Sequence, residues 1–210
     1  MQQFQFTEKW FQYTAHWWDD LFRVYEWPTA TRRAVLEIGS FEGQSTVWML
    51  MNLMKQPTDE IVCIDPFTGS EEHTANQTQE LFCRFQANVA QTGKESHVRV
   101  LRMRSVDGLP KLMAEGYRCD LAYIDGSHRA ADVLMDLCMT WPLLNFGGLC
   151  ICDDFLWQPH TSGSGDVLAS PKIAIDAFTT IFSDQIDLIR SPQNYQVAFI
   201  KRAHGGTYGE

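Results

Sequence analysis

Two adjacent aspartates, Asp153 and Asp154, follow an apolar run in the segment ICDDFLW, and a third, Asp125, follows the apolar run LAYI. Like charges near a core repel one another and are costly to desolvate when they are unpaired. If neighbouring parallel strands bring the three carboxylates together, a cation is needed to bind them, and oxygen ligands suit Mg²⁺, Mn²⁺ or Ca²⁺. The sequence therefore predicts a divalent metal site, with Mg²⁺ or Mn²⁺ as the expected ion. The alternative is structural: Asp153 and Asp154 cap the next segment or pair with Arg129.

His128 lies three residues after Asp125, at the expected start of a helix and beside the predicted metal site. An unperturbed histidine titrates near pH ~6.5, so it can accept a proton at physiological pH. We therefore expect His128 to be the catalytic base that takes the proton of a substrate hydroxyl. The alternative is a helix-start residue bonded to a carboxylate.

The segment LEIGSFEGQS (36–45) has the spacing Glu37-x-Gly39-x-x-x-Gly43. The glycines allow a tight turn and close approach of a ligand to the backbone. A dinucleotide fingerprint would need a glycine where Phe41 stands. The carboxylates suit an amine or a sulfonium better than a phosphate, although a plain glycine turn is the alternative. The expected cofactor-binding residues of this segment are Glu37, Gly39, Ser40, Glu42, Gly43 and Ser45.

Asp65 ends the next apolar run, IVCID, 22 residues after Gly43. An acidic residue at this place can accept hydrogen bonds from both hydroxyls of a ribose. Ser105 and Val106 follow the third expected strand, where an adenine ring would rest. Together with Asp125, these residues complete the predicted site of a nucleoside-bearing cofactor.

The elements that must position these residues alternate regularly between strand and helix. This alternation predicts a single Rossmann-like, doubly wound α/β sheet, mostly parallel and seven-stranded with an antiparallel last strand, preceded by an N-terminal helical segment. The expected strands are 34–39, 61–65, 98–102, 121–125, 148–154, 184–191 and 195–202, the last two joined by a turn at 192–194; the expected helices are 44–56, 76–91, 106–116, 129–144 and 171–182.

The combined motifs resemble those of class I S-adenosylmethionine-dependent methyltransferases over residues 34–202. VLEIGSFEGQS is similar to that fold's first motif, and IVCIDPF to its acidic second-strand end. AYIDGSH together with CDDF resembles the branch of macrocin-type sugar O-methyltransferases and cephalosporin-hydroxylase-like proteins. The resemblance implies S-adenosylmethionine as cofactor, Asp125, Asp153 and Asp154 as metal ligands and His128 as base. Position 153 departs from relatives that often carry Glu.

The length, composition and net charge of the chain restrict the class of protein. The 210 residues are 45% hydrophobic and 20% charged, as in a globular domain. The formal net charge of -9 argues against a nucleic acid or an anionic membrane as partner. We expect an aromatic helical segment at 1–33 that acts as a cover or lid, a methyltransferase domain at 34–202 and a flexible tail at 203–210. Six cysteines, four of them in apolar runs, fit a cytoplasmic protein with reduced thiols.

The leading hypothesis is metal-assisted O-methylation of a small hydroxylated metabolite, such as a sugar, a polyketide or a related natural product. Whether the chain forms a homo-oligomer is left open. Three alternatives remain: a metal-independent methyltransferase of the same fold, a nicotinamide-dependent oxidoreductase, and a non-catalytic protein that binds the cofactor.

Overall fold

The computed structural model describes residues 4–28, 32–69, 73–158, 166–191 and 195–203. Within them a seven-stranded sheet has the order β3-β2-β1-β4-β5-β7-β6. Strands β1 to β5 pair parallel with one another, and β7 pairs antiparallel with both β5 and β6, so β7 alone runs opposite to the other six strands. This architecture confirms the predicted fold. The strands are β1 (Ala34–Ile38), β2 (Glu60–Ile64), β3 (Val98–Leu101), β4 (Cys119–Ile124), β5 (Leu144–Cys152), β6 (Ile186–Arg190) and β7 (Val197–Lys201).

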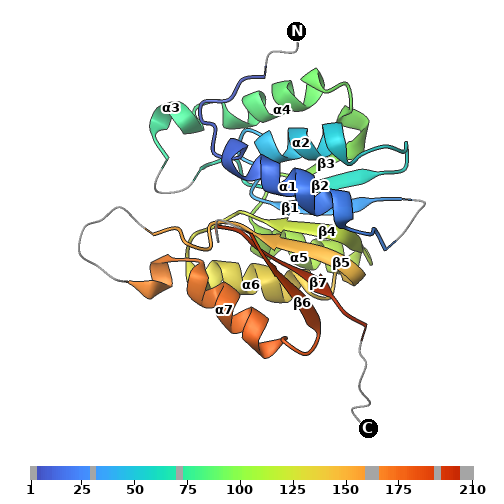
Figure 1. Cartoon of the computed structure of the whole chain (residues 1–210). Helices are drawn as coiled ribbons and strands as arrows, with labels where there is room; N and C mark the ends of the chain where they lie inside the picture. Colours follow the sequence, from blue (N-terminus) through green and yellow to red (C-terminus); the bar gives the residue numbers. More distant parts are fainter. Residues whose placement is uncertain (1–3, 29–31, 70–72, 159–165, 192–194, 204–210) are drawn as a thin grey trace.

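Helices cover both faces of the sheet (Figure 1). One buried cluster joins the sheet to α1, α2 and α4, and a second joins it to α5, α6 and α7. The central strands are therefore apolar on both sides, as parallel strands between two helical layers must be. Among the described residues no helix has the length and apolarity needed to cross a bilayer. The helices are α1 (Gln12–Val24), α2 (Gln44–Asn52), α3 (Ala75–Thr78), α4 (Leu81–Gln91), α5 (Ser105–Ala114), α6 (Ala130–Thr140) and α7 (Lys172–Ile181), with short 3-10 turns η1 (Glu95–His97) and η2 (Val167–Ala169).

The helix expected at 76–91 is two helices, because the chain turns at Gln79 and Glu80. Glu80 adopts a left-handed conformation with φ of 54°. The Arg84 guanidinium donates to the carbonyl oxygens of Gln77 and Gln79, so the broken helix end keeps its hydrogen bonds. The expectation of a single helix was wrong because hydrophobic periodicity does not show this side-chain interaction across the break.

Strand β5 begins at Leu144, four residues earlier than expected, and the preceding helix ends at Thr140. Its register with β4 shifts between Cys119 and Leu121, so the first part of β5 pairs separately from the rest. Downstream of the shift, Ile124 pairs with Cys152. The residues that follow these two strands therefore leave the sheet side by side.

All six cysteines are free thiols, and the four that were expected in the core are buried: Cys63, Cys119, Cys150 and Cys152.

Candidate active site

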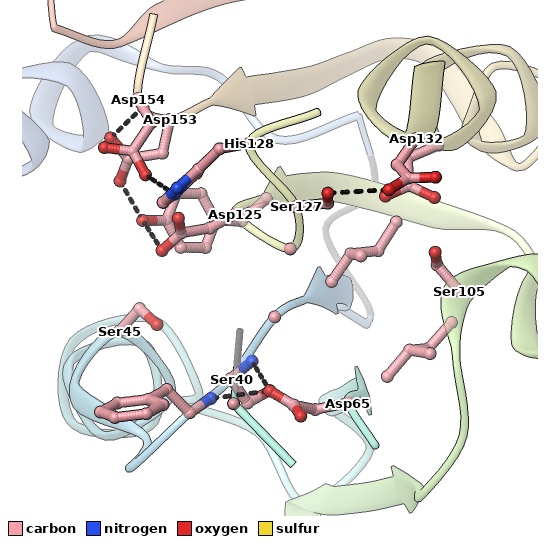
Figure 2. Close-up of a pocket in the computed structure, with 18 of the residues that line it drawn as sticks. Ser40, Ser45, Asp65, Ser105, Asp125, Ser127, His128, Asp132, Asp153 and Asp154 are labelled. Carbon is pink, nitrogen blue, oxygen red and sulfur yellow. Dashed lines mark hydrogen bonds and ion pairs between the residues drawn. The ribbon is translucent and has the colours of Figure 1, made fainter. Parts of the chain in front are cut away.

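A cavity of about 1050 Å³ opens at the carboxyl ends of the parallel strands. The loops after β1, β2, β4 and β5 and the start of α5 line it, and residues 10–14 close one side. Figure 2 shows Asp125, His128, Asp153 and Asp154 together on one side, with Asp65 and Ser105 elsewhere around the space. The strand ends thus gather most of the predicted residues around one cavity, as expected for an open α/β sheet.

Gly39 lies where the loop after β1 touches the end of β4. Its φ is 82°, and a Cβ there would lie only 1.9 Å from the carbonyl oxygen of Asp125. The Asp125 N–H donates to the Ile38 carbonyl oxygen at 2.8 Å, which holds the two segments together. Only glycine fits this contact, and it brings bare backbone to the wall of the cavity.

Asp65 holds the same loop from the end of β2. Its Oδ2 accepts from the backbone N–H groups of Ser40 and Phe41 at 2.8 and 2.9 Å, and its Oδ1 accepts from Phe67 N–H at 2.5 Å. A carboxylate has about four acceptor sites, so lone pairs remain for a ligand hydroxyl. Asp65 and Ser40 both line the cavity, consistent with the predicted ribose contact.

Glu37 is fully buried and lies outside the cavity lining. It accepts hydrogen bonds from the hydroxyls of Ser40, Ser45 and Thr46 at 2.5–2.6 Å and from the Cys63 thiol at 3.3 Å. Burial raises the pKa of the Glu37 carboxyl, and these donors oppose the rise. In this structure Glu37 stabilises the loop after β1 through these hydrogen bonds and does not line the cavity.

Glu42 was also expected to contact the cofactor, and it does border the cavity. Its carboxylate is fully buried and accepts from Arg84 Nε at 2.7 Å and from Thr7 N–H at 2.7 Å. These two contacts tie the N-terminal segment and α4 to the loop after β1. Gly43, with φ of 82°, starts α2 and lies behind the lining.

Ser105 and Val106 begin α5 and line the cavity, as expected for an adenine pocket. Beside them lies Asp136 of α6, which sequence reasoning missed. Desolvation raises the pKa of the Asp136 carboxyl to about 6, while a hydrogen bond with Ser105 lowers it. This part of the cavity therefore offers a buried carboxyl and a hydroxyl as partners for a polar ligand group.

Asp125, Asp153 and Asp154 meet at the opposite side. The Tyr123 hydroxyl donates toward Asp125 Oδ2 at 2.9 Å and also contacts Asp153 Oδ2. Burial raises the pKa of Asp125 well above its ordinary value, and Asp153 and Asp154 raise it further. Burial and the Asp154 charge raise the pKa of Asp153 to about 6. A phenol has one proton to donate, so the Tyr123 hydroxyl can donate a hydrogen bond to only one of these two carboxylates at a time.

His128 approaches this corner from the loop before α6. Its Nε2 lies 2.7 Å from Asp154 Oδ2, and its ring centroid lies 4.0 Å from that of Trp157. The second nitrogen, Nδ1, is buried. The histidine is thus bonded to a carboxylate through Nε2 in this structure.

The donor set fits a divalent cation in its chemistry: three carboxylates gather at this corner, and the one arginine among the described lining residues, Arg104, stands just before α5. As the side chains stand, however, no group of three or more His, Cys, Asp or Glu in the described part of the chain has the spacing of a metal centre. Tyr123 occupies the space between Asp125 and Asp153, and Asp154 faces His128. A bound cation therefore requires these side chains to rotate.

Two further residues touch this corner and were not foreseen. Gln196 Nε2 donates to Asp153 Oδ2 at 2.7 Å. Tyr195 lines the cavity, and burial, the charge of Asp154 and a hydrogen bond to Asp154 raise the pKa of its hydroxyl. Tyr123 had a detectable signal, because it stands two residues before Asp125 and so shares its strand face. The other two become visible only when β7 is placed beside β5.

Comparisons with known proteins identify the family and the fold. A family model described as a methyltransferase domain matches residues 36–155. An uncharacterized protein, R132, of Acanthamoeba polyphaga mimivirus is 28% identical over 130 residues, 60% of this chain and 54% of that protein. The match thus spans about half the length of this viral relative.

Two solved structures share the fold. The calicheamicin methyltransferase CalS11 superposes with a TM-score of 0.63 at 16% identity, over 92% of this chain and 80% of its own. The O-methyltransferase TomG from Streptomyces achromogenes, involved in tomaymycin synthesis and solved with S-adenosylmethionine, gives 0.61 at 17% identity, over 81% and 74%.

Proposed function

The chain belongs to the methyltransferase-domain family and is an S-adenosylmethionine-dependent methyltransferase, and from this premise we propose that it methylates a hydroxyl oxygen of an uncharged small molecule. The family match confirms the resemblance to methyltransferases and sets aside the nicotinamide-dependent oxidoreductase. The observation that carries the finer proposal is the corner where His128, Asp125, Asp153 and Asp154 meet beside the loop after β1.

The chain's residues divide the work between binding and proton transfer. Gly39 and Ser40 offer their backbone to the methionine part of the cofactor, and Asp65 contacts the ribose. Ser105 and Asp136 form a polar pocket for the adenine ring. The methyl carbon exchanges its bond to sulfur for one to the acceptor oxygen, in line, so positioning is the main requirement. His128 Nε2 takes the proton that the acceptor hydroxyl releases.

Asp125, Asp153 and Asp154 would hold a divalent cation. When bound, such a cation makes an acceptor hydroxyl more acidic and helps to orient it. Without a cation, burial and the neighbouring carboxylates raise the pKa of Asp125 and of Asp153, while Tyr123 contacts both of them and His128 contacts Asp154.

The charges of the residues that line the cavity favour an uncharged acceptor. Seven Asp and Glu side chains and one arginine, Arg104, line the cavity in the described part of the chain. Arg104 precedes Ser105 and so lies beside the proposed adenine pocket. A phosphate or carboxylate on the acceptor would therefore meet an excess of like charges. Aromatic side chains near the carboxylate corner, among them Trp157 and Tyr195, favour the face of a ring.

Labelled methyl transfer tests this proposal. The full chain is incubated with S-adenosylmethionine bearing a labelled methyl group, Mg²⁺ and matched acceptors, such as a catechol with and without a ring carboxylate. We expect methyl ethers from the neutral members and at least about tenfold lower kcat/KM for their anionic partners, since tenfold corresponds to only ~1.4 kcal/mol. Methylation confined to amines, or anionic acceptors preferred over neutral ones, would contradict the proposal.

Asp154→Asn and Asp132→Asn separate the cation site from general charge effects. Asp154 has φ of 56°, which asparagine tolerates, so its replacement keeps the backbone. Asp132 lines the same cavity but accepts from Ser127 Oγ at 2.9 Å, outside the corner. We expect chelator to lower the melting temperature of the Mg²⁺-loaded wild type and of Asp132→Asn, and to leave Asp154→Asn unchanged. Equal melting of the wild type with and without chelator would remove the cation from the proposal.

A further inference from the structure

The segment before helix α1 is tied to the rest of the protein by two fully buried side chains. Asn88 of α4 binds both polar groups of the Gln5 backbone: its Oδ1 accepts from Gln5 N–H at 2.6 Å, and its Nδ2 donates to the Gln5 carbonyl oxygen at 3.0 Å. Glu42 Oε2 accepts from Thr7 N–H at 2.7 Å. Asn88 and Glu42 are both 0% exposed. An irregular segment keeps one path only when its backbone is held in this way.

Two glutamines extend these contacts to Glu8. Gln44 Nε2, at the start of α2, donates to the Glu8 carbonyl oxygen at 2.8 Å, and Gln77 Nε2 of α3 donates to Glu8 Oε1 at 3.1 Å. We name residues 5–11 the strap. Figure 1 shows this dark blue segment passing α3 and α4 before the chain enters α1. The strap therefore crosses the elements that surround the loop after β1.

The strap ends in aromatic residues that line the cavity, Trp10 and Phe11. The Trp10 ring meets the rings of Phe41 and His73, with centroids 5.6 and 5.7 Å apart, and Phe41 stacks on His73 at 4.6 Å. Trp10, Phe41 and His73 all line the cavity, and Trp10 is 49% exposed. The strap thus places a large, half-exposed ring at the edge of the cavity.

These rings lie where the methionine and ribose parts of the donor join in the proposed function. Phe41 follows Gly39 and Ser40, whose backbone faces the methionine part. The Phe41 N–H donates to Asp65 Oδ2 at 2.9 Å, and Asp65, the proposed ribose contact, also holds Ser40 (Figure 2). Phe41 has φ of 48°, a strained conformation of the kind that clusters at ligand clamps.

Helix α1 is not the movable part of this cover. Trp18 and Leu21 of α1 are buried in the core cluster that joins the helix to the sheet, so moving α1 would expose the core. Residues 5–8 of the strap are held by the hydrogen bonds to Asn88, Glu42 and the two glutamines. These bonds can open without disturbing the core.

We propose that Trp10 is a binding residue for the methyl donor and that the strap holds it over the donor, so that the donor and its demethylated product leave only when the strap opens. The inference rests on the donor position given in the proposed function. Opening breaks the bond between Thr7 and Glu42 and takes the Trp10 ring away from Phe41 and His73. A segment that closes over a bound molecule in this way sets the rate of its release.

Two matched pairs of variants test the inference on the full chain. Thr7→Pro removes the N–H that donates to Glu42, and its control Thr7→Ala keeps that N–H. Thr7 is exposed and lies outside the described lining of the cavity, so neither change removes a contact with the donor. Trp10→Ala removes the ring at the cavity edge. Its control is Phe146→Ala, at a ring that is 57% exposed and outside that lining. Urea unfolding measures the stability of each variant separately.

The measurement is the rate at which labelled S-adenosylhomocysteine leaves each variant during a chase with an excess of the unlabelled compound. We expect release about fivefold faster from Thr7→Pro, for the loss of one hydrogen bond. Release from Trp10→Ala should be about tenfold faster, and release from both controls should stay within about twofold of the wild type. Hydrogen exchange at the Gln5 and Thr7 amides of the wild type should slow when S-adenosylhomocysteine binds.

The possible failures are distinguishable. If Thr7→Pro releases S-adenosylhomocysteine no faster than Thr7→Ala, or if binding leaves hydrogen exchange in the strap unchanged, the strap does not hold the donor. If Trp10→Ala releases it at the wild-type rate, Trp10 does not bind the donor. Each of these results overturns the inference and leaves the proposed function intact. If the wild type does not bind S-adenosylhomocysteine, the donor site of the proposed function fails and the strap's role fails with it. Should Thr7→Pro not fold, Trp10→Ala and the exchange measurement decide.

Discussion

Replacing Gly39 by alanine tests the contact on which the whole site depends. Three costs add in this variant. Alanine at φ of 82° pays the left-handed penalty of about 1–2 kcal/mol. Its Cβ would lie 1.9 Å from the carbonyl oxygen of Asp125, where ordinary contacts begin at 3.4 Å. Overpacking of this kind costs about 1–3 kcal/mol, and displacing Asp125 also weakens its 2.8 Å bond to Ile38, worth about 1 kcal/mol. The sum is roughly 3–6 kcal/mol.

Gly93→Ala is the matched control. Gly93 has φ of 66°, and a Cβ there would meet nothing within 4 Å, so only the left-handed penalty applies. Urea unfolding should show Gly39→Ala less stable than Gly93→Ala by about 2–4 kcal/mol. Calorimetry should show weakened S-adenosylmethionine binding in Gly39→Ala alone. Equal stabilities and equal affinities in the two variants would refute the close contact between the loop after β1 and the end of β4.

Three other variants probe the remaining parts of the site. The pKa of Asp136 in the folded protein, about 6, lies above its ordinary value of 3.8. The wild type therefore loses stability as the pH rises from 3.8 to 6. Urea unfolding should show Asp136→Asn more stable than the wild type by about 2–3 kcal/mol at pH 8 and no more stable at pH 4. Arg84→Ala leaves the buried Glu42 carboxylate without its ion-pair partner and should lower the free energy of unfolding by about 3–5 kcal/mol. The control Arg23→Ala removes an ion pair with Asp20 in which both side chains are 72% exposed, and it should lower that free energy by under about 1 kcal/mol. Similar unfolding midpoints for the two variants would contradict this role of Arg84. His128→Ala should lower turnover about 10²–10⁴-fold with unchanged cofactor affinity, and a wild-type rate would exclude it as base.

The convergence of the three aspartates could be predicted because it depends only on strand order. Asp125 follows β4 and Asp153 and Asp154 follow β5, and these strands are neighbours in the parallel sheet. The same reasoning placed Asp65 beside the loop after β1. Each prediction needed only the rule that parallel strands end at one edge of the sheet.

The side chains that hold the aspartates could not be predicted in the same way. Gln196 reaches Asp153 only because β7 pairs antiparallel with β5 in one register, and a shift of one residue would turn it to the other face. Trp18 reads as one of many aromatic residues in an amphipathic segment. Its indole N–H donates to Gln196, which lies 178 residues away in the chain.

The motif acids were harder to interpret than their spacing suggested. Glu37 and Glu42 were expected to face the cofactor, yet the carboxylate of each accepts from groups of the protein itself. Spacing identifies the loop, but which way a side chain turns there depends on the donors that folding brings near. Those donors include Arg84 and Thr7, which lie far from the motif in sequence.

Crystals grown with S-adenosylhomocysteine and Mn²⁺ provide the most direct test of the central claim, the joint site of methyl donor and cation. The account predicts an anomalous Mn²⁺ peak bounded by Asp125, Asp153 and Asp154, with the ribose at Asp65 and the homocysteine sulfur directed toward His128. A fully occupied S-adenosylhomocysteine whose sulfur points away from His128, with no Mn²⁺ at the three aspartates, would contradict it.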